Sequence, residues 1–406
     1  MKILIFNVKY SPNLGDGVLA ACLEHGLMRE GRDVTVETID IAGREEYRFQ
    51  GPGRMRALSL LRLLPAPLRA AAVTFVLRSR LRDMKAHWLK RIEEADAVVV
   101  GGGNLFQDDD LNFPLKLNAV LEGVDLAGKP LAVFAVGVTA HWSARARRLF
   151  ARLLDCPVVH VSVRDGHARE NWIAHFGNRF EVEVTPDPGL LARNLPSGPA
   201  LPYVGPPVVG LGVTHPLVLR RHAGIPDAQI PLSSAAEHRL LVRWLVDAGC
   251  RVMLFTNGAD EDERFMRQVV AGSVCEDCVQ AGSVVLAERP STPDDLVATI
   301  GRSAVVIAHR LHASIVAYSL GIPCVGLGWD QKVKSFYEET GRADFFLRGK
   351  DVKPADVGAH ALRALEAGIA SGDHARQLKR AETGLVRLTE RLRSATGQYL
   401  PGRARI

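Results

Sequence analysis

Two histidines and an arginine stand where an apolar strand pattern gives way to a helix pattern. His309, Arg310 and His312 follow the run "SAVVIA" and lead into "ASIVAYSLGIP". The ordinary pKa of imidazole lies near neutrality, so a histidine can give or take a proton at a reacting atom. A guanidinium offers a planar fork that fits a carboxylate or a phosphate. The segment predicts acid–base chemistry on an anionic substrate, although His309 can equally be a hydrogen-bonded histidine at a strand end.

An arginine and an aspartate end two other strand patterns. Arg164 closes "SVRD" beside Asp165, where it can bind an anion or simply pair with its neighbour at a helix start. Asp187 lies between two prolines in "TPDPGLL". Rigid backbone geometry and contact with a ligand explain this placement equally well.

The first strand pattern is followed by "NLGDGVL". Gly15 removes a side chain from the turn, and Asn13 and Asp16 place polar side chains next to it. Asp16 can also act only as the cap of the following helix. We expect these three residues to contribute to substrate binding.

A later strand pattern leads into "VVVGGGNLFQDDD". Gly101, Gly102 and Gly103 are predicted to form a loop whose backbone amides approach a substrate, with Asn104 beside them; a tight strand-to-helix turn is the alternative. Neither glycine-rich stretch is GxGxxG, and neither carries the lysine of a phosphate-binding P-loop. A generic nucleotide fingerprint is therefore absent.

No metal site or cofactor is predicted. The two histidines of "HRLH" lack a third ligand at convincing spacing, and "CEDC" at 275–278 lacks a second pair of ligands. The aspartates "DDD" at 108–110 are better placed to cap a helix than to bind magnesium.

Short β-branched runs alternate with amphipathic stretches along most of the chain. Near-continuous apolar strands separated by helices indicate parallel sheets covered on both faces. In such sheets ligands bind beyond the carboxyl ends of the strands, which is where the polar residues above stand. The clearest expected strands are "KILIFNV", "DVTVETID", "ADAVVVGGG", "PLAVFAVGV", "VVHVSVRD", "FEVEVTPD", "VVGLGV", "RVMLFTN", "SVVLAE", "AVVIAHR" and "CVGLGW".

A proline-rich break at residues 194–207 divides the chain, because five prolines and two glycines in "NLPSGPALPYVGPP" cannot continue a regular element. We therefore expect an α/β protein with two Rossmann-like, doubly wound domains facing a central cleft. The expected units are an N-terminal domain at 1–195 with a basic insertion at about 41–92, a C-terminal domain at 208–350, and helices within 351–406, at about 354–368 and 372–396, that can pack back on the N-terminal domain.

Length and composition fit this organisation. At 406 residues the chain exceeds the usual size of a single core, and 47% apolar with 24% charged residues excludes disorder. The net charge of +6 favours anionic ligands or surfaces without identifying them. Six cysteines are too few for a disulfide framework, and "MKILIFNVKY" enters a strand pattern at once, so we expect a cytoplasmic protein.

Five motifs in this order resemble the polysaccharide pyruvyl transferase family: "NLGDGVL", "GGGNLFQDD", "SVRD", "PDPGLL" and "HRLHASIVAYSLGIPCVGL". They span residues 13 to about 340, apart from the insertion. The resemblance implies a GT-B-like fold and ketal pyruvyl transfer from phosphoenolpyruvate to a sugar hydroxyl pair of a cell-surface polysaccharide or its lipid-linked precursor. It also implies that Arg164 and His312 are the essential residues.

The residue types suit that reaction. Phosphoenolpyruvate carries a phosphate and a carboxylate, which Arg164, Arg310 and the glycine-rich stretches can bind. His312 can supply the acid–base group that ketal formation needs, an effect typically worth about 10² to 10⁴ in rate.

Two other functions remain open. A GT-B glycosyltransferase would use a nucleotide sugar and release a nucleoside diphosphate. A non-enzymatic basic binding protein is disfavoured as a nucleic-acid binder, because aromatic residues that could stack on bases make up only 6% of the chain.

The insertion carries an unusual charge pattern. Residues 53–91 hold ten lysines and arginines against one acid, Asp83, around a leucine-rich middle at 58–77. Arg62 and Pro65 make a membrane span costly, so the segment is predicted either to lie on an anionic membrane at the cytoplasmic face or to cover the core of the first domain.

Overall fold

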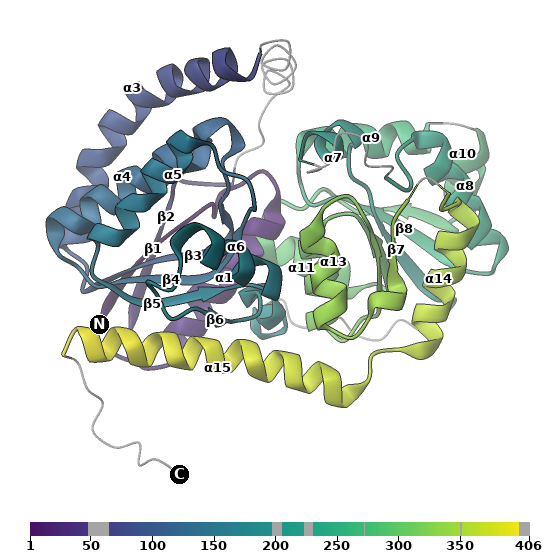
Figure 1. The fold of residues 1–406 in the computed structure, drawn as a ribbon. Helices are drawn as coiled ribbons and strands as arrows, with labels where there is room; N and C mark the ends of the chain where they lie inside the picture. The colour runs from purple at the N-terminus through teal and green to yellow at the C-terminus, as the bar shows by residue number, and fades with distance from the viewer. Residues whose placement is uncertain (48–64, 197–204, 223–229, 272, 350, 398–406) are drawn as a thin grey trace.

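The structure is a computed structural model that describes residues 1–47, 65–196, 205–222, 230–271, 273–349 and 351–397 (Figure 1). Two six-stranded parallel sheets lie in succession along the chain, each with helices on both faces. The strand orders are β2-β1-β3-β4-β5-β6 and β12-β11-β10-β7-β8-β9. The predicted fold class, two doubly wound α/β units, is confirmed.

The first sheet and its helices come from the N-terminal half of the chain. Its central strands are buried on both faces, as in β4, where all eight residues of "LAVFAVGV" are buried. The strands are β1 (Lys2–Asn7), β2 (Thr35–Asp40), β3 (Ala97–Phe106), β4 (Leu131–Val138), β5 (Val158–Val163) and β6 (Glu183–Val184). The helices are α1 (Leu14–Arg29), α3 (Ala66–Glu93), α4 (Asn112–Ala127), α5 (Ala144–Phe150) and α6 (Gly166–Phe176), with 3₁₀ turns η1 (Asp109–Leu111), η2 (Ala151–Asp155) and η3 (Pro188–Asn194).

The second sheet follows the proline-rich break, part of which (197–204) lies outside the described residues. Its strands are β7 (Val208–Gly212), β8 (Arg251–Phe255), β9 (Val284–Leu286), β10 (Val305–Ala308), β11 (Cys324–Leu327) and β12 (Phe346–Leu347). The helices are α7 (Pro216–His222), α8 (Ala235–Asp247), α9 (Asp260–Val270), α10 (Ser273–Gln280), α11 (Pro293–Gly301), α12 (Leu311–Ser319), α13 (Gln331–Glu339), α14 (Pro354–Ala367) and α15 (Ser371–Ala395), with the turn η4 (Ala343–Phe345).

The glycine triplet does not form the predicted loop. Gly101, Gly102 and Gly103 lie inside β3 and are buried. A Cβ on Gly102 would lie 1.9 Å from a side-chain carbon of Leu19, so this glycine lets α1 approach the sheet closely. Of the three glycines, Gly103, with φ of +84°, has no atom within 4 Å of an added Cβ, whereas the other two have close neighbours, so packing rather than a ligand accounts for most of the triplet.

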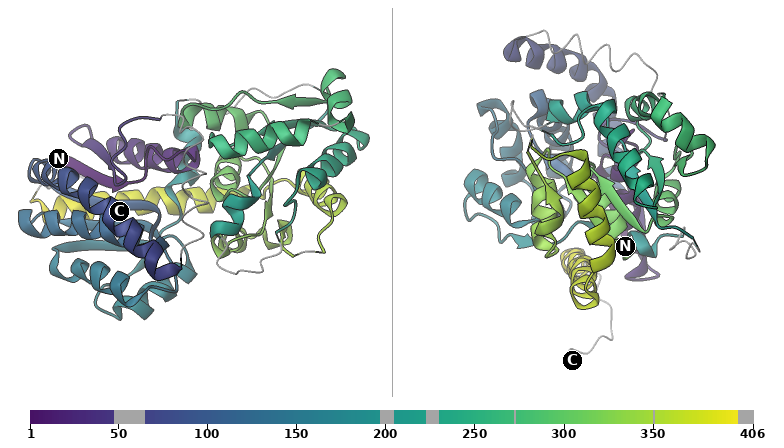
Figure 2. Two further views of the ribbon diagram at one scale, coloured as in Figure 1. Left: turned by 90° about the horizontal axis from the view of Figure 1, so that it is seen from above. Right: turned by 90° about the vertical axis from the view of Figure 1, so that its right-hand side faces the viewer.

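The last helix, α15, returns to the first sheet (Figures 1 and 2). Its Arg393 pairs with Asp33 at 2.9 Å, and its Arg387 pairs with Glu183 at 3.0 Å. The chain therefore crosses between the two sheets twice, once before β7 and once between α14 and α15.

Part of the basic insertion forms helix α3. Residues 53–64 of the insertion lie outside the described residues. Trp88 and Ile92, in the C-terminal half of α3, are buried in the core of the first sheet, and the ring of Trp88 meets Phe6 edge-on at 5.6 Å. Among the helices that the structure describes, none is both long and apolar enough to cross a bilayer.

Candidate active site

The N-termini of helices α1 and α12 meet between the two sheets, and His312 lies at their contact. Its Nδ1 is 3.3 Å from Oδ1 of Asp16. A Cβ on Gly15 would lie 2.5 Å from the Cβ of His312, so the close approach of the two helices requires glycine there. The capping role predicted for Asp16 is wrong: α1 begins two residues earlier with Asn13 as its N-cap, which leaves the Asp16 carboxylate facing His312.

Asp187 links this histidine to Arg164. Its Oδ2 lies 3.8 Å from Nε2 of His312 and 3.8 Å from Nη1 of Arg164. Oδ1 of Asp187 accepts a hydrogen bond from the Gly189 amide at 2.9 Å and caps η3, so both explanations of this aspartate have support. Its Oδ2 and Nε2 of His312 are buried without a hydrogen-bond partner in the part of the chain that the structure describes.

The Arg164 guanidinium is buried beside the Asp165 carboxylate and close to Asn104 and Gly137. Asp165 caps α6 by accepting from the Ala168 amide at 2.7 Å, and its carboxylate is 3.5 Å from Nε of Arg164. A Cβ on Gly137 would lie 2.4 Å from Oδ1 of Asn104 and 2.9 Å from Nη2 of Arg164. Gly137 thus allows Asn104 and the guanidinium to come together above β4, the strand that contains this glycine.

A pocket lies between the two sheets, next to Arg164 and Asp187. Arg164, Asp165 and Asp187 line it from the first sheet. Lys332 and Glu339 line it from α13 of the second, and Gln377 of α15 closes one end. Both halves of the protein therefore contribute charged groups to one cavity.

Sequence reasoning noted the rim "WDQKVKSFYEETG" but did not select Lys332 as a site residue. Its Nζ lies 3.1 Å from Oδ2 of Asp330 and 4.6 Å from the centre of the Trp329 ring. Asp330 caps α13 by accepting from the Lys332 amide at 3.0 Å, which fixes where the lysine leaves the helix. The signal available in the sequence was the strand-to-helix junction "GLGWDQK", the same kind of junction that holds His312.

Glu339 was also missed. Its Oε1 accepts a hydrogen bond from the Gly166 amide at 3.2 Å, so a carboxylate of the second sheet stands at the N-terminus of α6 in the first. Burial, with the nearby charge of Asp165, raises the pKa of Glu339, although that hydrogen bond opposes the shift. The sequence does not distinguish Glu339 from the adjacent Glu338, which is exposed.

The environment keeps His312 neutral near pH 7. Burial lowers the pKa of its imidazole, and Arg164 and Lys332 lower it further, while Asp187 and Asp16 oppose the shift. A proton on Nδ1 faces Asp16 and leaves Nε2 with a free lone pair. The histidine is thus prepared to accept a proton.

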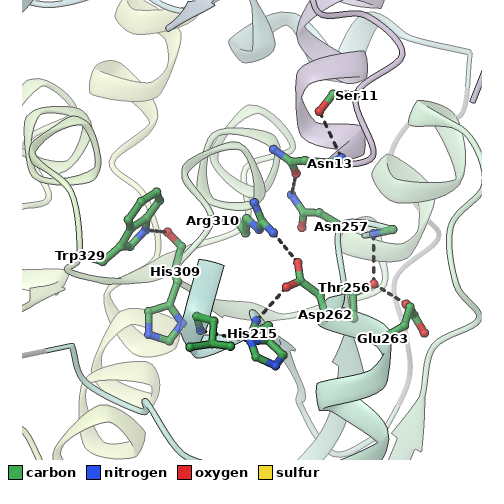
Figure 3. Close-up of polar contacts among 12 residues, drawn as sticks. Ser11, Asn13, His215, Thr256, Asn257, Asp262, Glu263, His309, Arg310 and Trp329 are labelled. Carbon is green, nitrogen blue, oxygen red and sulfur yellow. Dashed lines mark hydrogen bonds and ion pairs between the residues drawn. The ribbon is translucent and has the colours of Figure 1, made fainter. Parts of the chain in front are cut away.

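His309 and Arg310 do not line the pocket. Figure 3 shows the polar contacts around these two residues. His309 is fully buried, its Nε2 meets the Pro231 carbonyl at 2.7 Å, and burial lowers its pKa to about 3. His309 is therefore a hydrogen-bonded histidine at a strand end, which was the alternative to a role in substrate binding. Arg310 caps the start of α12 with its backbone, and its Nη2 donates to Oδ2 of Asp262 at 2.5 Å.

Asn13 ties the two halves together near His312 (Figure 3). Its side-chain oxygen accepts from Nδ2 of Asn257 at 3.1 Å, and the Leu14 amide donates to the Asn257 carbonyl at 2.8 Å. These bonds hold the start of α1 against the second sheet, so Asn13 positions Gly15 and Asp16.

The aspartates at 108–110 have structural partners. Asp108 caps η1 by accepting from the Leu111 amide at 3.0 Å, and it accepts from the Ser143 amide at 2.8 Å. Asp110 pairs with Arg69 at 2.5 Å. Among the described residues, no group of three or more histidine, cysteine, aspartate or glutamate side chains is arranged to hold a metal ion.

Two solved structures illustrate the similarity of the fold. A protein assigned as a UDP-N-acetylglucosamine 2-epimerase of Listeria monocytogenes is 12% identical, with a TM-score of 0.57 over 100% of this chain and 99% of that chain. The UDP-GlcNAc 2-epimerase of Methanocaldococcus jannaschii, solved with UDP-GlcNAc and UDP, is 10% identical, with a TM-score of 0.52 over 94% and 99%. At this identity the likeness establishes the GT-B-type fold alone.

Comparison by sequence is more specific. The profile of the polysaccharide pyruvyl transferase family matches residues 13–331, which include Asp16, Arg164, Asp187 and His312. None of the curated protein sequences matches the chain significantly.

Proposed function

Because the chain belongs to the polysaccharide pyruvyl transferase family and is thus a transferase, we propose that it forms a pyruvyl ketal on a sugar hydroxyl pair of a cell-surface polysaccharide or its lipid-linked precursor, with phosphoenolpyruvate as donor. The observation that carries the proposal is the pocket that Arg164 and Lys332 line from opposite sheets, where Oδ2 of Asp187 lies 3.8 Å from both Arg164 and His312. A three-carbon donor with two anionic groups suits this arrangement.

Arg164 and Lys332 would bind the donor from opposite sides. The guanidinium of Arg164 presents a planar fork that matches a carboxylate, whereas the ammonium of Lys332 is a compact charge suited to a phosphate. The pocket also holds carboxylates, so it is not uniformly positive. We infer that one of them, Glu339, is protonated when the donor is bound, because burial already raises its pKa.

Glu339 and His312 would divide the proton transfers. Their environments move the two pKa values toward each other, upward for the carboxyl and downward for the imidazole. Each shift favours the neutral form of its group, and in that form the carboxyl can donate a proton and the imidazole can accept one. Glu339 would donate a proton to the methylene carbon of phosphoenolpyruvate, and Nε2 of His312 would accept the proton of the attacking sugar hydroxyl.

The scheme balances without a cofactor. The first hydroxyl oxygen bonds to the central carbon of the donor as the methylene becomes a methyl group. The bond from that carbon to the phosphate oxygen then breaks, and phosphate leaves with the electron pair and the proton held by His312. The second hydroxyl closes the ketal and returns its proton to Glu339. Two hydroxyl protons are thus passed to the methyl group and to phosphate.

The direct test is incubation with phosphoenolpyruvate and a panel of lipid-linked, nucleotide-linked and free sugars. We expect phosphate release together with a product whose mass corresponds to one pyruvyl ketal. Release of a nucleoside diphosphate from a nucleotide sugar without phosphoenolpyruvate would instead support the glycosyltransferase alternative. If neither product forms, the result would support the alternative of a non-enzymatic binding protein.

A further inference from the structure

Helix α3 packs on the first sheet mainly through its C-terminal half, whereas its N-terminal half leaves two large apolar side chains exposed. Leu81, Trp88 and Ile92 are buried in the core. In the N-terminal half, by contrast, Leu68 is 57% exposed and Phe75 is 81% exposed. Figures 1 and 2 show this half at the outer edge of the molecule, standing away from the sheet that its other half covers.

Cations surround the exposed apolar side chains. Residues 66–92 carry seven lysines and arginines and a single acid, Asp83. Arg80 and Arg82 are exposed, five and seven residues beyond Phe75. Three other basic residues are held by carboxylates of the first domain: Arg69 by Asp110, Lys85 by Glu122, and Arg91 by Glu37.

We propose that the N-terminal half of α3, with Leu68, Phe75, Arg80 and Arg82, docks the enzyme on an anionic lipid bilayer. The two apolar side chains would enter the boundary between headgroups and acyl chains, while the arginines stay among the anionic headgroups. A helix that lies in the interface needs no membrane-spanning length. The inference is independent of the pyruvyl transfer chemistry and goes beyond it.

A second copy of this chain fits the same surface less well. A symmetric dimer places the same patch of both subunits face to face, so the positive charges of Arg80 and Arg82 would be brought close to those of the second copy. An anionic leaflet offers the opposite charge, and each basic residue close to such a leaflet contributes roughly a factor of five to the partition coefficient. Charge complementarity therefore favours the bilayer.

Vesicle flotation with the full chain tests the proposal. The probes are phosphatidylcholine vesicles with and without phosphatidylglycerol, at low and at high salt. We expect binding to the anionic vesicles only, weakened by salt because screening shortens the reach of the arginines. Arg80→Ala combined with Arg82→Ala should lower the partition coefficient roughly 30-fold. Leu68→Ser combined with Phe75→Ser should lower it roughly tenfold or more.

Matched controls come from other surfaces. Leu126 and Leu240 are 76% and 62% exposed, so Leu126→Ser with Leu240→Ser removes similar apolar surface elsewhere. Arg376→Ala with Lys379→Ala removes two exposed cations of α15, whose side chains are 65% and 77% exposed. These control variants should float as the wild-type chain does.

Several outcomes would overturn the proposal. One is that the intact chain fails to bind anionic vesicles at low salt. Another is that the α3 variants float to the same extent as the control variants, which would assign binding to another surface. A change from dimer to monomer caused by Leu68→Ser with Phe75→Ser, in a chain that does not float, would assign this surface to a second copy. Phosphate release on a soluble acceptor reports the proposed function separately.

Discussion

Replacing Gly15 by alanine should separate catalysis from stability. The added Cβ would lie 2.5 Å from Cβ and 2.9 Å from Nδ1 of His312. Real Cβ atoms do not approach another carbon so closely, so either the imidazole or the start of α1 must shift. Because Asp16 is the next residue of α1 and faces Nδ1 of His312, either shift alters the pair that orients the histidine.

The expected loss follows from the size of this displacement. Restoring ordinary van der Waals contact at about 3.5 Å requires a movement of about 1 Å, and a misplacement of that size can lower the rate about 10²-fold. Stability should change less, since alanine in a helix is favoured over glycine by about 0.5–1 kcal/mol, which partly offsets the local strain.

Steady-state phosphate release measures the turnover number and KM for phosphoenolpyruvate, and thermal unfolding measures stability. Gly372→Ala is the matched control, because this helical glycine of α15 has no atom within 4 Å of the position of an added Cβ. If Gly15→Ala turned over within twofold of Gly372→Ala, His312 would not depend on this contact and the assignment of the histidine would be refuted.

Three further predictions concern the pocket. His312→Ala should lower turnover about 10²- to 10⁴-fold without unfolding the chain. His309→Ala should leave turnover unchanged but lower the free energy of unfolding by about 2 kcal/mol, because it leaves the buried Pro231 carbonyl unpaired. Steady-state kinetics and denaturant unfolding distinguish the two effects. Arg164→Lys should raise KM for phosphoenolpyruvate about tenfold and spare acceptor binding; unchanged donor kinetics would instead favour pairing with Asp165. Glu339 must be protonated to act, so turnover should fall as pH rises through its raised pKa, and Glu339→Gln should lose that alkaline limb along with most activity; a limb that persists in the variant excludes Glu339 as the acid.

Much of the fold was predictable because it depends on apolar patterning. Near-continuous apolar runs specify buried parallel strands, and the helices expected at 354–368 and 372–396 are observed at Pro354–Ala367 and Ser371–Ala395. The triplet beginning at Gly101 misled because glycine is typical of loops, whereas here α1 needs its missing side chains for close packing.

The site was predictable only in part. His312 and Arg164 follow strands, and the carboxyl ends of parallel strands share one edge of a sheet. The role of His309 was harder to predict. Its side chain is fully buried and bonds to the Pro231 carbonyl, and the sequence alone does not specify that contact. Lys332 and Glu339 depend on which face of α13 meets the other sheet, and that is a property of the packing between distant segments.

The double crossing of the chain determines how the two halves can move. A single connection would leave every rotation available, but two connections define an axis and leave a hinge opening about it. Leu190, just before the first crossing, and Gln377, just after the second, both line the pocket, so the pocket lies beside that axis. Atoms move in proportion to their distance from an axis. Opening would therefore widen the cleft more on the side far from this axis than at the pocket.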